Sequence, residues 1–202
     1  MMVRVLRILK THHFKPEKMN TRKLSCLIVG VFLLFTGLNS QTLTGVSTIW
    51  DDDFGEWSIF IEGDTINLGS LELNSTLGSA RLDWNYRVLE THGRIRNLQR
   101  NDFSRWEVQG PFNLVTIRPQ WRDDLRDWRV TDNRITINWR SKYQGHFEEW
   151  EVSHRDFGYF AMYTLNPGDP RDWIIVDRMR EDVPFEMKMA FVFLTVFLTS
   201  PF

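Results

Sequence analysis

Close to its C-terminus the chain reads MKMAFVFLTVFLT, residues 187–199, and the architecture follows from this stretch. From Met189 to Leu198 its only polar residue is Thr195, so a helix here is apolar on every side and has to be surrounded. The 12 residues from Met187 to Leu198 give a helix of about 18 Å, which is too short for the ~30 Å hydrocarbon core of a bilayer. We therefore expect a helix over about residues 184–199 that is covered by the rest of the protein.

The covering shell is predicted to consist of strands. From Thr48 to Asp177 the chain has no long helical period, and it shows short runs of alternating polarity separated by Gly, Asn, Asp and Pro. Such alternation indicates strands with one buried face, and about twelve runs occur at the spacing expected of an antiparallel barrel or sandwich. We predict a mainly β fold over residues 41–202: a closed antiparallel barrel of about twelve strands around the C-terminal hydrophobic helix. The clearest runs are 57–61, 70–73, 81–88, 114–117, 134–139 and 159–163.

A motif of a charged residue, Trp, any residue and then Val or Ile recurs along these runs, with its Trp at positions 57, 106, 128, 150 and 173. The last four copies are 22, 22 and 23 residues apart, which is one hairpin per copy. Trp and the branched residue two positions later point to the same face of a strand. We predict that each copy supplies both side chains to the barrel interior; the alternative is a row of platforms for sugar rings.

The first 40 residues have the pattern of an export signal. Arg22-Lys23 precedes an apolar run of 15 residues from Leu24 to Leu38, and small or polar residues follow. A basic start, a short apolar run and a small-residue exit are the parts of a secretory signal. Because a membrane span needs about 20 residues, we expect cleavage near Ser40 and export to the periplasm, the cell envelope or the extracellular space. The alternative is a protein anchored by the uncleaved N-terminal helix.

Met19 is a natural start for this signal, so residues 1–18 are either a long basic region or precede the true start. Cleavage removes Cys26, the only Cys of the chain. The exported domain then has no disulfide and depends on packing alone.

Charge is distributed unevenly along the chain. Residues 1–40 carry seven basic residues against Glu17 alone, whereas residues 41–202 carry 18 basic and 25 acidic residues, a balance of −7. An acidic domain has no overall attraction to phosphate backbones, so we predict no nucleic acid as a partner, and membrane contact only through the leader or the terminal helix. Arg outnumbers Lys, which occurs only at Lys142 and Lys188 in the domain. This indicates ion pairs and stacking on aromatic rings; the alternative is an arginine cluster that binds a ligand.

Residues 182–194 combine acids, a Met-Lys pair and an aromatic-rich apolar run, and they are similar to the end of phospholipid scramblases. With the many short strands, this makes residues 46–202 resemble the tubby-like superfamily, which also includes tubby C-terminal domains and LURP-one-related proteins. The resemblance implies a twelve-stranded barrel wrapped around a hydrophobic C-terminal helix, here in an exported bacterial version.

Three departures limit what the resemblance implies. Scramblases lack a cleaved export signal, whereas this chain begins with the pattern of one. Tubby domains bind phosphoinositides through basic residues, but this domain is acidic. Scramblases have a calcium-associated acidic segment before the helix; here acids occupy that region at spacings that do not reproduce a calcium loop. We therefore expect the fold and not the lipid chemistry. The acids concerned are Asp169, Asp172, Asp177, Glu181 and Asp182.

The remaining polar clusters predict no catalytic, cofactor-binding or metal-binding residue. Asp51-Asp52-Asp53 is interpreted as a solvated run, because consecutive residues of an extended chain point in alternating directions. The segment 123–127 is interpreted as a turn whose acids pair with Arg122 and Arg126.

Acids and imidazoles surround Trp150 as well. Glu149 and Glu151 should share the solvent face of one strand. His146 and His154 flank this strand and are interpreted as surface residues, since they lack the spacing of zinc ligands.

From these patterns we predict a non-enzymatic exported barrel that acts as a structural or binding module for an unknown partner. Two alternatives stay open. One is a membrane-associated protein with scramblase-like lipid interaction, and the other is a secreted hydrolase that uses a carboxylate pair.

Removal of the terminal helix tests this architecture. Burial of the eight largest apolar side chains of the helix contributes very roughly 12–24 kcal/mol before entropy, which is on the order of the net stability of a domain. We expect the fragment 41–183 to be unfolded, as judged by circular dichroism and thermal melting. A soluble fragment that melts cooperatively contradicts this expectation.

Overall fold

The structure is a computed structural model that describes residues 41–74, 83–99, 102–152 and 156–201. The expected signal over residues 1–40, its cleavage near Ser40 and the possible start at Met19 lie outside the described residues.

The described chain forms twelve strands followed by one helix, α2 (Phe185–Thr199). The predicted helix over about 184–199 is therefore confirmed. The strands are β1 (Leu43–Trp50), β2 (Asp53–Ile61), β3 (Asp64–Leu73), β4 (Asp83–Val88), β5 (Thr91–Asn97), β6 (Trp106–Gln109), β7 (Leu114–Pro119), β8 (Asp127–Thr131), β9 (Thr136–Ser141), β10 (Glu149–Val152), β11 (Gly158–Thr164) and β12 (Asp172–Met179).

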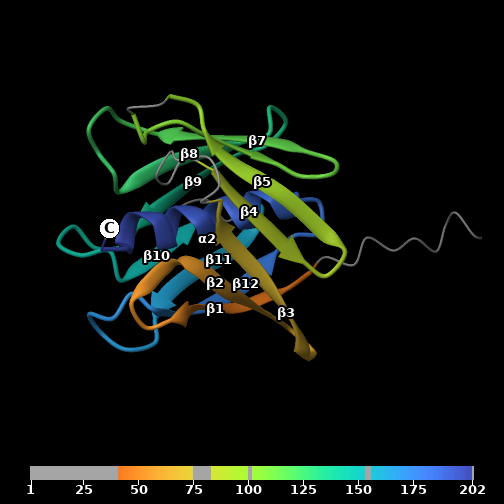
Figure 1. Cartoon of the computed structure of the whole chain (residues 1–202). Helices are drawn as coiled ribbons and strands as arrows, with labels where there is room; N and C mark the ends of the chain where they lie inside the picture. Colours follow the sequence, from red (N-terminus) through yellow and green to blue (C-terminus); the bar gives the residue numbers. More distant parts are fainter. Residues whose placement is uncertain (1–40, 75–82, 100–101, 153–155, 202) are drawn as a thin grey trace, which may run out of the picture. The chain divides into compact units, whose positions relative to one another are not determined.

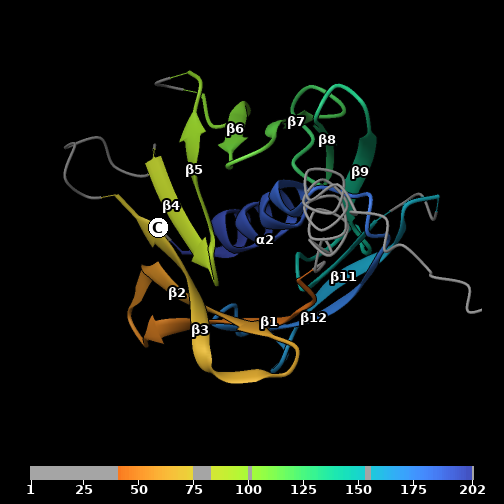
Figure 2. The same cartoon turned by 90° about the vertical axis from the view of Figure 1, so that its right-hand side faces the viewer.

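The strands form a closed barrel. Each strand pairs antiparallel with the next in sequence, and β12 closes the ring by pairing with β1, where Val46 lies opposite Trp173. α2 runs through the space that the strands enclose (Figures 1 and 2). The predicted fold class, a closed antiparallel barrel of twelve strands around a hydrophobic C-terminal helix, is thus confirmed.

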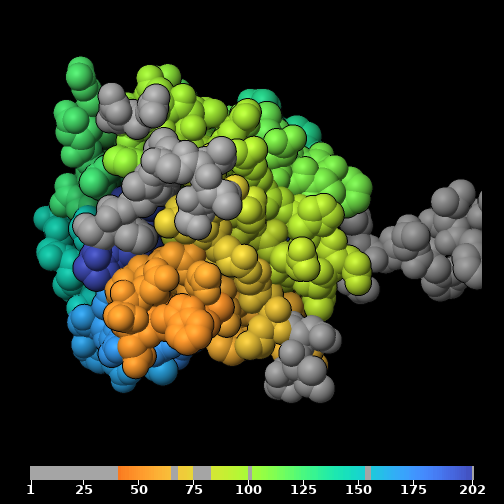
Figure 3. All heavy atoms as spheres, viewed as in Figure 1, coloured from red at the N-terminus to blue at the C-terminus, as the bar shows by residue number. Residues whose placement is uncertain are grey.

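Aromatic contacts fill the space between α2 and the wall. All residues of α2 from Glu186 to Val196 are buried. The ring of Phe191 stacks on Trp139 at a centroid distance of 4.9 Å, and Phe193 meets Trp106 edge-on at 4.7 Å. In the space-filling view, α2 is visible only as dark-blue atoms at the left end of the molecule (Figure 3).

The Trp motif belongs to the core, as predicted, because all five of its Trp side chains are buried. Four of the five lie at the first or second position of an even-numbered strand, as does Trp84 on β4, whereas Trp57 lies in the middle of β2. Even-numbered strands of an antiparallel meander run in the same direction, so the Trp residues at strand beginnings gather at one end of the barrel. The sugar-platform alternative is excluded for them, since a buried ring cannot stack on a ligand.

Each Trp of the motif also closes a turn. Its indole N–H donates a hydrogen bond of 2.6–2.8 Å to the carbonyl three residues earlier. In four copies an Asp four residues before the Trp accepts the backbone N–H two residues after itself, at 2.7–3.1 Å. The full motif is therefore a turn in which Asp and Trp satisfy the backbone. The capping acids are Asp53, Asp102, Asp124 and Asp169.

One buried ion pair ties α2 to the strands that close the barrel. Lys188 Nζ lies 2.8 Å from Asp177 Oδ2, and the two side chains are 2% and 1% exposed. Lys188 also donates to the Gln41 carbonyl at 3.1 Å. Asp177, on β12, accepts the backbone N–H groups of Leu43 on β1 and of Met179, both at 3.1 Å. The pair thus satisfies backbone groups of both strands at the seam.

A second charge is buried at the start of α2. Glu186 is 2% exposed, and Asn113 Nδ2 donates to its Oε2 at 3.2 Å; the helix N-terminus favours a negative charge there. Gly110 provides the room, because a Cβ at this position would lie 2.1 Å from Glu186 Oε1. Burial, and to a smaller extent the Glu186 charge, raises the pKa of Tyr86. Its phenol is therefore neutral over the whole physiological pH range.

Substitution of Asp177 tests the anchoring of α2. In D177N the Lys188 ammonium stays buried without its carboxylate, and loss of one partner of a buried ion pair costs about 3–5 kcal/mol. We expect a decrease of this size in the free energy of unfolding, measured by urea denaturation. The double variant D177N/K188M removes both charges and should recover most of the loss. A single variant as stable as the parent protein contradicts this role.

Candidate anion-binding cleft

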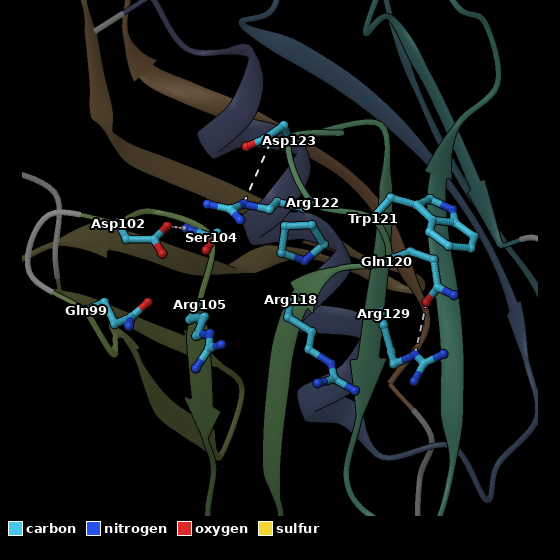
Figure 4. Close-up of a pocket in the computed structure, with 11 residues that line it drawn as sticks. Gln99, Asp102, Ser104, Arg105, Arg118, Gln120, Trp121, Arg122, Asp123 and Arg129 are labelled. Atoms are coloured by element: carbon cyan, nitrogen blue, oxygen red, sulfur yellow. Dashed lines mark hydrogen bonds and ion pairs between the residues drawn. The ribbon is translucent and has the colours of Figure 1, made fainter.

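A cleft of about 820 Å³ lies on the outside of the barrel, where β6, β7 and β8 meet the loops at their ends. Four of its side chains are guanidinium groups, which makes it unusual on an acidic domain. The cleft is lined by Gln99, Asp102, Ser104, Arg105, Arg118, Pro119, Gln120, Trp121, Arg122, Asp123 and Arg129 (Figure 4).

Three of the arginines form a row across adjacent strands. Arg118 on β7 is the register partner of Arg129 on β8. Arg105 directly precedes Trp106, which pairs with Ile117, so Arg105 lies beside Arg118 on the other side. Figure 4 shows the three side chains next to one another and extended in the same general direction. Because adjacent strands are about 4.8 Å apart, the backbone positions of the three arginines span about 10 Å. We call Arg105, Arg118 and Arg129 the arginine row.

Among the described residues, the arginine row forms no close ion pair, and Asp102 and Asp127 act on Arg105 and Arg129 only from a longer distance. No carboxylate of the described residues lies within 4.0 Å of its three guanidinium groups, whereas most arginines in the same part of the chain do have such a partner. Like charges directly opposite each other on paired strands destabilise a sheet, so the row costs stability and leaves donors free. The paired arginines are Arg94, Arg96, Arg122, Arg126, Arg134, Arg140, Arg171 and Arg180.

A neutral side chain holds one member of the row, Arg129, in place. Arg129 Nε donates to Gln120 Oε1 at 3.0 Å, which fixes one edge of the guanidinium and leaves its outer N–H groups free. Trp121 follows Gln120 and is 64% exposed at the Arg129 end of the cleft (Figure 4). Arg122 and Asp123 extend the loop beyond it, with a loose pair at 3.9 Å between two highly exposed side chains.

An acid stands at the opposite end of the row. Asp102 accepts the backbone N–H of Ser104 at 2.8 Å. Hydrogen bonds from the side chain and the backbone of Ser104 hold the pKa of Asp102 below its usual range. Asp102 is therefore a carboxylate at neutral pH, able to accept hydrogen bonds but not to donate a proton. The cleft combines four cations, two anions, neutral amides and one exposed indole.

The acidic clusters seen in the sequence have structural roles. Asp53 of the run 51–53 caps a turn, which refines the interpretation of this run as solvated. In the segment 123–127 the expected pairs are present: Arg122 with Asp123, and Arg126 with Asp124 at 2.9 Å. Both segments are thus turns of the Asp–Trp motif. Within the described residues, no group of three or more His, Cys, Asp or Glu side chains is placed to hold a metal ion.

The acids around Trp150 are likewise paired. Glu151 lies 3.5 Å from Arg140, and Glu149 forms an ion pair with Lys142. His146 is exposed beside Glu148, as expected of a surface imidazole, and His154 lies outside the described residues. None of these groups faces the arginine row.

One pair of carboxyl groups is relevant to the alternative that the protein is a hydrolase. Asp124 and Asp127 line a second cleft of about 320 Å³. Burial raises the pKa of Asp127, while the side-chain and backbone hydrogen bonds of Arg126 lower the pKa of Asp124. Opposite shifts are typical of acid–base pairs. Here, however, both oxygens of Asp124 accept hydrogen bonds from Arg126, at 2.9–3.1 Å, so Asp124 has a structural role in its turn.

A scan against known protein families and searches of curated proteins and of solved structures found no match to this chain. Among the described residues, no helix combines the length and the hydrophobicity that crossing a bilayer requires.

The sequence did not predict the arginine row. Its members are separated by 13 and 11 residues, and only the register of β6, β7 and β8 brings them together. A usable signal was nevertheless present: Arg105 and Arg129 each adjoin a motif Trp. Because the Trp points inward, its neighbours along the strand must point outward.

Proposed function

We propose that this protein is an exported, non-enzymatic barrel of the tubby-like kind that binds an anionic ligand in the arginine cleft. The observation that carries the proposal is the arginine row, in which three guanidinium groups from adjacent strands have no carboxylate within 4.0 Å among the described residues. A guanidinium presents a planar fork of donors that matches carboxylate, phosphate and sulfate oxygens.

The charge of the domain restricts how the ligand binds. At −7 over residues 41–202 the overall field repels anions, and at physiological ionic strength charges more than about 8 Å away are largely screened. Attraction therefore acts only inside the cleft. This favours a ligand recognised by direct contacts with the arginine row over one that is held by a broad basic surface.

Two observations support the wider classification. Twelve strands closed around an apolar C-terminal helix are what the resemblance to the tubby-like superfamily implies. A barrel that is stabilised by packing, with no Cys in residues 41–202, is compatible with an oxidising compartment outside the cytoplasm. Export itself is proposed from the leader sequence.

The two alternative functions are less well supported. A scramblase-like lipid interaction through the terminal helix would need apolar surface, but residues 186–196 of α2 are buried inside the barrel. A hydrolase would need an available carboxylate pair, and Asp124 already accepts three hydrogen bonds from Arg126 in its turn.

Binding of tripolyphosphate, a short linear polyanion, tests the proposed function. A hydrogen bond to a charged group contributes about 1.5–3 kcal/mol, so R118A should weaken binding about 10- to 100-fold in isothermal titration calorimetry. The loss should shrink as NaCl is raised toward 1 M, where the screening length falls to about 3 Å.

R178A is the matched control for this titration. Arg178 on β12 is also an exposed arginine without a carboxylate partner among the described residues, but it lies outside the cleft. It should bind tripolyphosphate like the parent protein. Equal affinities for the parent protein and R118A, or equal losses for R118A and R178A, would show that the arginine row is not the site.

A further inference from the structure

We propose that the ligand of the cleft is a segment of an acidic glycan chain, a carbohydrate with repeated sulfate, phosphate or carboxylate groups, and that one sugar ring stacks on Trp121. This inference rests on the proposed function, because it assigns the ligand class of the same cleft.

The first argument is the position of Trp121. Seven of the nine Trp side chains are buried in the barrel; Trp121 and Trp50 are the exposed ones. Trp50 donates its indole N–H to Glu56 at 3.0 Å. Trp121, by contrast, has no ring contact and no hydrogen bond through its indole within the described residues. A large apolar ring left open beside a polar cleft offers a flat surface and a free donor to a ligand.

The second argument is the mixture of charges in the cleft. Arg105, Arg118 and Arg129 attract anionic groups, but Asp102 and Asp123 line the same space. A polyanion without hydroxyl groups meets repulsion from these two carboxylates. A carbohydrate turns them into partners, because its hydroxyl groups donate to carboxylates. Asp102 is suited to this role, since it is an exposed carboxylate whose position is fixed by the Ser104 N–H, which donates to its Oδ1.

Neutral side chains point to the same ligand class. Gln99, Gln120 and Ser104 supply amide and hydroxyl groups that both donate and accept. Such groups match the hydroxyl groups of a sugar and add little to the binding of a bare phosphate chain. Site clefts of about 300–1,000 Å³ accommodate a small organic ligand, so the 820 Å³ cleft has room for a few sugar units.

The spacing of the arginine row favours a ligand with several anionic groups over a ligand with a single anionic group. The arginine row presents three guanidinium groups from backbone positions about 5 Å apart, and their side chains lie next to one another (Figure 4). One sulfate or carboxylate can engage at most two neighbouring members of the row. A glycan whose anionic groups repeat along the chain engages all three while a ring lies over Trp121 at the Arg129 end of the row (Figure 4).

The experiment compares two probes on the purified protein by calorimetry: a heparin-derived sulfated hexasaccharide and tripolyphosphate. The parent protein should bind the hexasaccharide at least tenfold more tightly. W121A should weaken hexasaccharide binding about three- to tenfold, the range of one aromatic contact, and leave tripolyphosphate binding unchanged. W121F retains a ring and should recover most of the affinity.

W50A is the matched control, because Trp50 is similarly exposed, at 57%, but lies on β1 outside the cleft. It should bind both probes like the parent protein. The glycan assignment is overturned if W121A binds the hexasaccharide like the parent protein, or if tripolyphosphate or a single-stranded oligonucleotide binds as tightly as the hexasaccharide. If R118A still weakens tripolyphosphate binding in that case, only the ligand class is wrong. If R118A has no effect on either probe, the proposed function fails as well.

Discussion

The burial of α2 is the constraint from which the rest of the structure follows. A helix that is apolar on every side cannot be left in water, and the chain covers it with twelve strands. The helix in turn supplies the barrel with its core, because the rings of Phe191 and Phe193 pack against Trp139 and Trp106. The charged exceptions, Lys188 and Glu186, lie in the first turn of α2 and bond to groups of the wall. Shell and core therefore depend on each other.

The repeat that builds the core also builds the cleft. Each motif Trp is fixed twice, by its burial and by its indole hydrogen bond to the turn that precedes it. Arg105 and Arg129 are direct neighbours of Trp106 and Trp128, so the inward Trp directs each guanidinium outward. The register of β7 then places Arg118 between them. The three arginines repel each other, but β6, β7 and β8 hold them side by side because the inward faces of these strands are stabilised by packing in the core. Such positioned, unpaired donors are what an anionic ligand requires.

Much of the fold could be predicted from the sequence, since periodicity reports directly on burial. The alternation of polarity gave the strands, the 22-residue spacing of Trp gave the hairpins, and the apolar stretch 187–199 gave the central helix. Trp84 was not recognised as part of the repeat, because the residue two positions after it is Tyr86 and the motif requires Val or Ile there. The role of the capping Asp residues was missed because turn hydrogen bonds depend on backbone geometry, which the pattern of polarity does not report.

The candidate site could not be predicted in the same way. The expected ion pairs are present for Arg96 and Arg126, among others, but among the described residues the arginine row has no carboxylate within 4.0 Å. A net charge of −7 averages over the domain and hides three neighbouring cations. Only pairing across strands reveals them, and pairing is set by hairpin lengths and by the Asp–Trp turns. The exposure of Trp121 could not be predicted either, because most Trp residues of this chain belong to the core and the sequence does not distinguish it from them.

Amide hydrogen exchange of α2 is the most direct measurement of the central claim. If the helix is sealed inside the closed barrel, the amides of residues 189–196 can exchange only when the whole domain unfolds. Followed by mass spectrometry under native conditions, they should be among the slowest in the protein and match the free energy of global unfolding from denaturation. Exchange of these amides through a local opening, with a free energy well below that of the strands, would contradict a helix enclosed by the barrel.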